Sequence, residues 1–171
     1  MGALSNTVMA CLVCLSLVCV IFAVTTGVFI YLFVTSDVVK GMVVKDSPYS
    51  TPQTMGRLEL LVKSDTDLKF ISRISHRANA KAAGLDLGPM EVLIFSDPKR
   101  TTPVLQSEQT FGIDLPQKIL VYTDSDGDTK VVYNAQTYLS WRHSLGVENS
   151  DLAKVESTLD ELTEKAIKED N

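Results

Sequence analysis

The chain has 171 residues, and the first 36 contain no charged side chain. Roughly 130 residues remain beyond that segment, which is enough for one domain with its own core but not for two. The net charge of −5 argues against a nucleic-acid surface, because phosphate contacts need clustered lysine and arginine and the longest basic cluster here is Lys99-Arg100. We therefore expect one membrane-attached domain without a nucleic-acid partner.

The N-terminal segment predicts a helix that spans a membrane. Residues 7–35 are almost all apolar or small, and about 27 helical residues at roughly 1.5 Å each span about 40 Å, against a hydrocarbon core of about 30 Å. A cleaved signal peptide needs a basic n-region, a shorter apolar core and a small-residue exit, and the segment has none of them. We expect residues 1–36 to be an uncleaved single-pass anchor in membrane lipid.

Two kinds of residue within this helix bear on what it contacts. Cys11, Cys14 and Cys19 are interpreted as small apolar packing residues, because a lipid setting does not suit a redox or metal pair. Gly27 follows two threonines, and small residues of this kind let helices approach each other closely. We expect integral membrane protein partners to contact the helix around Gly27.

Residues 37–149 predict a soluble α+β domain with a small mixed or antiparallel sheet. Short apolar runs of strand length alternate with segments of helical spacing, and Pro, Gly and Asp residues separate them. The expected strands are residues 41–45, 68–74, 90–95, 118–123 and 130–133. The expected helices are residues 52–63, 77–83 and 135–145, with a helix or a compact loop over residues 101–110.

Two local signals refine this pattern. Thr51 followed by Pro52 predicts the N-cap of the first helix of the domain. Aspartates at 124, 126 and 128 resemble a calcium loop, but an EF-hand needs Gly at its sixth position and Glu at its twelfth, where this chain has Thr129 and Ala135. We therefore expect a hairpin turn there.

Residues 150–171 predict a C-terminal amphipathic helix that Ser150 caps. Apolar residues recur along it at three- and four-residue spacing, at Leu152, Val155, Leu159, Leu162 and Ala166. Such a stripe must be covered, because each buried Leu or Val contributes about 1.5–3 kcal/mol. It lies on its own sheet or docks on a partner, and we expect the protein's own domain to cover its first turns.

The stretch from about residue 41 to residue 145 resembles the family catalogued as domain of unknown function 302. The resemblance is carried by several motifs, among them Ile74-Ser75-His76, Val92-Leu93-Ile94-Phe95, Asp97-Pro98-Lys99, Gly112-Ile113-Asp114-Leu115-Pro116, and Tyr138-Leu139 before Arg142-His143. It implies a compact α+β domain and no particular activity. The chain departs from the family at Ser96-Asp97-Pro98, where Gly-Asn-Pro is usual, and at Gln106, where Met is common. These departures alter the character of any pocket that they line.

The candidate site residues are His76, Asp114 and His143. The chain has only these two histidines, and histidine is the side chain best suited to proton transfer or metal binding near neutral pH. We expect the three residues to lie in one neighbourhood, either as a functional site or as separate structural groups. Arg142 is expected to form a structural ion pair with Asp114 or Asp97. No catalytic residue, metal or cofactor is assigned.

Two functional classes fit these patterns. In the first, which we favour, the chain is a non-catalytic accessory subunit of a larger membrane complex, such as a respiratory or photosynthetic electron-transfer complex. In the second, it is a membrane-tethered ligand-binding, metal-binding or enzymatic domain that uses the region of His76, Asp114 and His143. Lys40 and Lys45 favour a cytoplasmic domain, but exported and anchored members would suit the family, so we expect the extracytoplasmic, or periplasmic, side.

Overall fold

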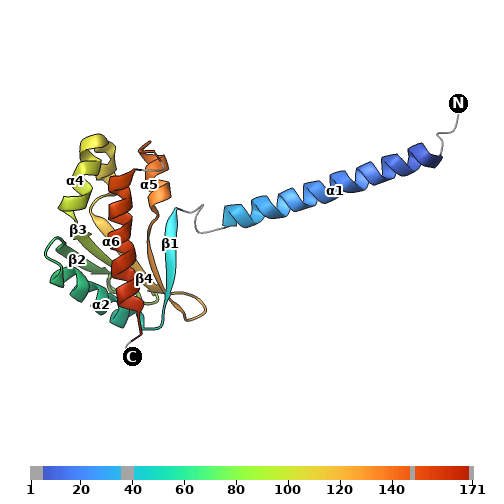
Figure 1. The fold of residues 1–171 in the computed structure, drawn as a ribbon. Helices are drawn as coiled ribbons and strands as arrows, with labels where there is room; N and C mark the ends of the chain where they lie inside the picture. Colours follow the sequence, from blue (N-terminus) through green and yellow to red (C-terminus); the bar gives the residue numbers. More distant parts are fainter. Residues whose placement is uncertain (1–5, 36–40, 147–148, 170–171) are drawn as a thin grey trace. The chain divides into compact units, whose positions relative to one another are not determined.

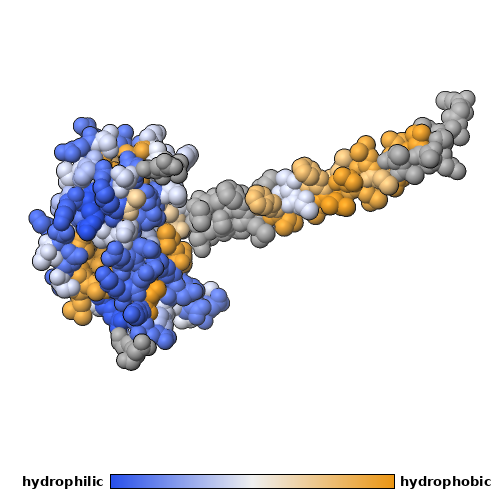
Figure 2. Space-filling view, in the orientation of Figure 1, coloured by the Kyte–Doolittle hydropathy of each residue, from blue (hydrophilic) through white to orange (hydrophobic). Residues whose placement is uncertain are grey.

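The computed structural model describes residues 6–35, 41–146 and 149–169. The chain divides into two units, residues 1–40 and residues 41–171. In the first unit, α1 (Asn6–Thr35) is one continuous helix, and Leu12–Phe29 within it is apolar, exposed and long enough to cross a membrane. The predicted apolar helix is therefore confirmed, and the side chains of α1 that are coloured by hydropathy in Figure 2 are mainly hydrophobic.

The second unit is an α+β domain, as predicted. Its first elements are β1 (Met42–Ser47), α2 (Thr51–Ser64), β2 (Lys69–Ser75), α3 (His76–Ala82), β3 (Met90–Ser96) and α4 (Pro98–Ser107). They are followed by the 3-10 helix η1 (Gln109–Asp114), β4 (Gln117–Thr123), β5 (Thr129–Asn134), α5 (Gln136–Arg142) and α6 (Ser150–Ile167). The alternative left open for residues 101–110 is thus resolved as a helix that continues into a short 3-10 turn.

The five strands form one sheet in the order β1-β5-β4-β3-β2, and every neighbouring pair is antiparallel. Alternate residues of a strand point to opposite faces of a sheet. Helices α2 and α6 cover one face, as Figure 1 shows for α6 in red. The side chains that point to these helices are apolar and buried, among them Leu93, Phe95, Ile119, Val121 and Val131.

Helix α6 is an integral part of this domain. Two buried clusters form the core, one between the sheet and α2, the other among α4, η1 and α5. Leu159, Leu162 and Ala166 of α6 belong to the first cluster, and Leu152 and Val155 belong to the second. The domain therefore covers the whole stripe and not only its first turns. The expected boundary between residues 149 and 150 does not separate two compact units, because residues 41–171 form one unit.

Two helix caps differ from the prediction by one residue. Ser50, not Thr51, precedes α2, and its backbone N–H donates to Gln53 Oε1 at 3.1 Å. Asn149, not Ser150, caps α6, because its Oδ1 accepts from the N–H groups of Asp151 and Leu152 at 3.1 and 3.0 Å. Both caps use a short polar side chain, which is the usual chemistry at a helix start.

The acidic turn between β4 and β5 closes a hairpin, as predicted. Asp124 Oδ1 accepts from the N–H groups of Asp126 and Asp128 at 3.0 and 2.9 Å. Gly127 has φ of 92°, a conformation that a side chain disfavours. Because Asp124 already bonds the turn's own backbone, the loop shape follows from local bonds.

Candidate functional site

The His143–Asp114 pair lies where the C-terminal end of α5 meets η1. His143 Nε2 is 2.6 Å from Asp114 Oδ2, and the His143 side chain is only 3% exposed. Helix α5 begins directly after β5, and Asp114 ends η1 just before β4. The neighbouring strands β4 and β5 therefore carry these two residues to the same end of the sheet.

The other ring nitrogen of His143 faces a hydroxyl. Its Nδ1 lies 2.9 Å from Thr110 Oγ1, and that hydroxyl donates to Glu108 Oε1 at 2.7 Å. The Thr110 hydroxyl therefore lies between the Glu108 carboxylate and the imidazole. The Asp114 carboxylate only accepts. Thr110 and Asp114 thus each face one ring nitrogen of His143, and the imidazole is held between them.

Charges and a ring hold the pair in place. Arg142 Nε lies 3.4 Å from Asp114 Oδ2, which confirms the expected structural ion pair. A hydrogen bond to Tyr138, followed by the charge of Asp114, raises the pKa of the Arg142 guanidinium. Phe111 contacts the His143 ring edge to face, with ring centroids 5.6 Å apart. Asp97, the other carboxylate expected as a partner of Arg142, instead binds Arg100.

The order hydroxyl, imidazole, carboxylate resembles a catalytic triad, and its details favour a structural role. In a triad the imidazole accepts the hydroxyl hydrogen as it acts as a base. Here the Thr110 hydroxyl gives its hydrogen to Glu108, and this bond lowers the pKa of the Glu108 carboxyl. His143 is also nearly closed to solvent. The network therefore ties α5 to η1.

His76 does not share this neighbourhood, so the expectation that all three residues converge is wrong. His76 follows Ser75, which pairs with Glu91 near the start of β3, and β3 begins beside the end of β4. Asp114 precedes the start of β4. The antiparallel register thus places His76 and Asp114 at opposite ends of the strands, which the sequence motifs alone do not reveal.

The family-like motifs do meet around a shallow hollow of about 330 Å³. It is lined by Ser96, Asp97, Pro98, Thr101, Thr102, Leu105, Leu115 and Pro116. The departure at Ser96-Asp97-Pro98 therefore falls on its wall. Asp97 is 2% exposed and is fixed there, because its carboxylate accepts from the Arg100 backbone at 3.2 Å and from its guanidinium at 3.1 Å.

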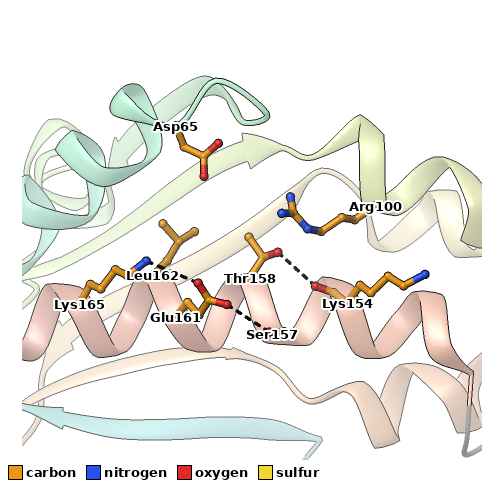
Figure 3. A pocket seen from close by; sticks show the side chains of 8 residues that line it. All are labelled: Asp65, Arg100, Lys154, Ser157, Thr158, Glu161, Leu162 and Lys165. Carbon is orange, nitrogen blue, oxygen red and sulfur yellow. Dashed lines mark hydrogen bonds and ion pairs between the residues drawn. The ribbon is translucent and has the colours of Figure 1, made fainter.

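A second hollow, of about 190 Å³, lies along α6 and is polar (Figure 3). Arg100, Lys154 and Lys165 give it basic groups, and Asp65 and Glu161 give it acidic ones. Each basic side chain already has an acidic partner: Asp97 for Arg100, Asp151 for Lys154 and Glu161 for Lys165. The hollow therefore presents paired charges and offers no strong preference for an anion or a cation.

Metal binding has no visible support within the described ranges. No group of three or more His, Cys, Asp or Glu side chains among those residues could hold a metal ion.

The side-chain amide of Gln117 has an unpaired nitrogen, since Gln117 Nε2 is buried without a hydrogen-bond partner in the described part of the chain. Buried amides are normally paired, and Gln117 directly follows Pro116 of the first hollow.

The sequence interpretation missed Thr110 and Glu108, which complete the network around His143. The signal was available, because only Phe111 separates Glu108-Gln109-Thr110 from the Gly112–Pro116 motif. Glu108 also caps η1, since its side chain accepts from the Thr110 N–H. Trp141 of α5 is 79% exposed and does not belong to the core.

The family profile described as "Domain of unknown function DUF302" matches residues 43–167. The match includes α6, so the C-terminal helix belongs to the family domain, contrary to the earlier limit at residue 145. In the solved structures, an uncharacterized conserved DUF302 protein from Bacillus stearothermophilus is similar with a TM-score of 0.65 and 24% identity. The similarity covers 74% of this chain and 98% of that protein, and it concerns the fold.

Curated relatives with longer chains are also similar. A protein named fluoride-specific ion channel FluC 1 from Brucella suis is 37% identical over 113 residues, which are 66% of this chain and 44% of that one. The FluC 1 protein of Brucella abortus is 37% identical over the same length, or 41% of its own chain. This chain thus spans less than half the length of these relatives.

Proposed function

Because the chain belongs to the DUF302 family, we propose that it is a membrane-anchored, non-catalytic accessory subunit of an integral membrane protein. The observation that carries this proposal is the similarity to chains that are named ion channels and are more than twice as long as the matched segment. In such relatives a segment like this one shares a polypeptide with a membrane protein. In this chain, the apolar helix α1 would bring the domain close to a membrane protein without a shared polypeptide.

The length of the similarity supports this assignment. The first unit of the chain has 40 residues, whereas the similar segment has 113. Most of that segment must therefore come from the α+β domain. A domain that is found within a channel chain in one protein and behind a single apolar helix in another is well placed to assist a membrane protein in both.

The apolar helix supports the same idea. Its described side chains between Leu12 and Phe29 are exposed within the chain, so they are available to lipid or to another helix. An added Cβ at Gly27 would meet nothing within 4 Å. Small residues allow close helix contacts in lipid, and we assign the region around Gly27 to the contact with the partner.

We further propose that the domain lies on the extracytoplasmic side, in keeping with the sequence-based expectation. An electron-transfer complex, respiratory or photosynthetic, stays a prediction for the identity of the host. The names of the relatives favour a channel-like host instead. Labelling of a cysteine introduced at Ser125, which is exposed in the hairpin, would decide the side in intact cells, because an impermeant reagent reaches only the outer face.

Copurification tests the main proposal. The tagged full chain is extracted from its native membranes in mild detergent, and its mass is measured by native electrophoresis. We expect it to migrate with a larger integral membrane protein that mass spectrometry identifies. A chain that is recovered alone under several mild detergents would contradict the accessory role.

A small-ligand-binding domain is the second candidate, because family motifs line the hollow around Leu105, Leu115 and Pro116. Its wall combines these apolar side chains with the buried Asp97, and the unpaired Gln117 amide lies one residue beyond Pro116. Native mass spectrometry of the extracted chain would distinguish the two. A bound small molecule that is lost in Leu105→Trp supports this candidate, and a ligand-free chain in a large complex supports the first.

A further inference from the structure

One face of the five-stranded sheet is not covered by α2 or α6. In β3, Leu93 and Phe95 point into the core, so Val92 and Ile94 point the other way. The same alternation holds along the paired residues of the other strands, and in β2 it resumes at Ser72 after a bulge between Phe70 and Ser72. The apolar side chains of this second face are half-buried or, in Val132, just buried, and neither core cluster includes them. We call this surface the open sheet face.

The register aligns one apolar row across the whole open sheet face. Ile74 pairs with Val92, Val92 with Leu120, Leu120 with Val132 and Val132 with Val44. All five strands thus contribute one branched apolar side chain to a single line that is perpendicular to them. Contiguous apolar surface of this kind on a folded domain marks an interaction site.

The two ends of the open sheet face carry opposite charge. At the hairpin end, Lys130 is surrounded by Asp46, Asp124 and Asp128, at 2.6, 3.5 and 3.5 Å, which leaves an excess of two negative charges. Lys118 lies at the other end, opposite Ile94. Its ammonium donates to the carbonyl oxygens of Asp114 and Pro116 and is exposed. The face is therefore basic at one end and acidic at the other.

We propose that the open sheet face is the docking surface for a second copy of this chain. A two-fold axis between the two faces, perpendicular to the strands, would superimpose the apolar row on the same row of the partner. The same rotation exchanges the two ends of the strands. It therefore brings Lys118 of each copy towards the acidic hairpin end of the other, so that one surface is complementary to itself.

The size of the face sets the strength of the contact. Five strands spaced about 4.8 Å apart and about six residues long give roughly 500 Å² per copy. Stable interfaces bury about 800 Å² per partner, so the pairing is weak in dilute solution. Anchoring of both copies in one membrane raises their effective concentration. The dimer therefore forms when both copies are bound to the membrane.

The test measures dimerisation of the full chain, by sedimentation in detergent over a range of protein-to-detergent ratios and by cross-linking in liposomes. We expect a reversible dimer whose dissociation constant rises at least tenfold in Leu120→Lys. Leu60→Lys is the matched control, because Leu60 is exposed on α2 and lies outside the open sheet face. Circular dichroism checks that both variants are folded.

Exchanging charges at exposed positions of the face tests dimerisation without changing the buried core. Lys118→Glu alone should weaken the dimer several-fold, and the double variant with Asp46→Lys should recover part of this loss, because Asp46 lies at the hairpin end two strands from β4. A wild-type chain that is monomeric in liposomes would overturn the proposal. So would dimers that survive Leu120→Lys, since they would use another surface. Loss of a copurifying membrane protein, rather than of the dimer, in Leu120→Lys would assign the face to that protein instead and overturn it equally.

Discussion

At the scale of single residues, the His143 network carries a measurable part of the domain's stability. His143 is buried between Asp114 and Thr110, and its removal leaves a carboxylate with one partner fewer. We expect His143→Ala to lower the free energy of unfolding by roughly 1–3 kcal/mol, the cost of leaving a buried polar group unpaired. Urea unfolding of the detergent-solubilised chain, followed by circular dichroism, measures this loss.

A double-mutant cycle makes that prediction specific. If His143 and Asp114 act on each other, the double alanine variant should lose less than the two single losses added together. Arg142→Gln is the matched control, because Arg142 is exposed and exposed ion pairs contribute at most about 1 kcal/mol. Additive losses at the two positions would contradict a direct interaction.

A second residue-scale prediction concerns acid stability. The Asp160 carboxylate accepts from Lys45 Nζ at 2.6 Å and from the Tyr133 hydroxyl at 2.8 Å. The bond to Lys45, then the bond to Tyr133, lowers the pKa of Asp160 from its usual value of 3.8. A lowered pKa stabilises the fold fully above the usual value, and the contribution is lost as pH falls from that value through the lowered pKa of the folded state.

Asp160→Asn should therefore destabilise the chain at pH 7 and match the wild type more closely at pH 3. The unfolding midpoint in urea at several pH values measures this convergence. Asp126→Asn serves as the control, because Asp126 is exposed in the hairpin turn. A constant gap between Asp160→Asn and wild type from pH 7 to pH 3 would show that the carboxylate's charge is not involved.

At the scale of elements, α6 joins the two core clusters, so its stripe is expected to dominate the stability of the domain. Leu159 is 3% exposed in the first cluster. Leu159→Ala should cost about 2–5 kcal/mol, the range for large-to-small changes in a core. Ser157→Ala on the exposed side of the same helix should change stability by at most about 0.5 kcal/mol. Equal losses in both variants would mean that α6 does not pack as described.

The elements were largely predictable from the sequence, because local patterns determine them. The apolar run of residues 90–95 predicted β3, and helical spacing in residues 52–63 predicted α2, each to within about one residue at either end. The partner of the α6 stripe was not predictable. An apolar stripe has the same spacing whether it lies on its own sheet or on another protein, and only the three-dimensional structure decides between them.

At the scale of the whole molecule, the candidate site was predictable only in part. Asp114 and His143 lie near the ends of elements that β4 and β5 bring together, whereas His76 lies at the opposite end. That separation follows from the strand order, which is a long-range property that motif spacing does not contain. The uncharged N-terminal segment, in contrast, was sufficient to predict one apolar helix, since length and composition decide it.

The anchor yields the last prediction, which tests whether α1 contacts a partner protein. Gly27 has open space around it within this chain, so Gly27→Leu should leave the folding of the chain unchanged. A leucine there would block close approach of another helix, and we expect copurification of the membrane partner to fall several-fold. Val18→Leu is the control, because nine residues at about 100° each place Val18 on the opposite side of the helix. Equal recovery of the partner with Gly27→Leu and wild type would exclude this contact, since an added Cβ at Gly27 meets nothing within 4 Å in the described part of the chain.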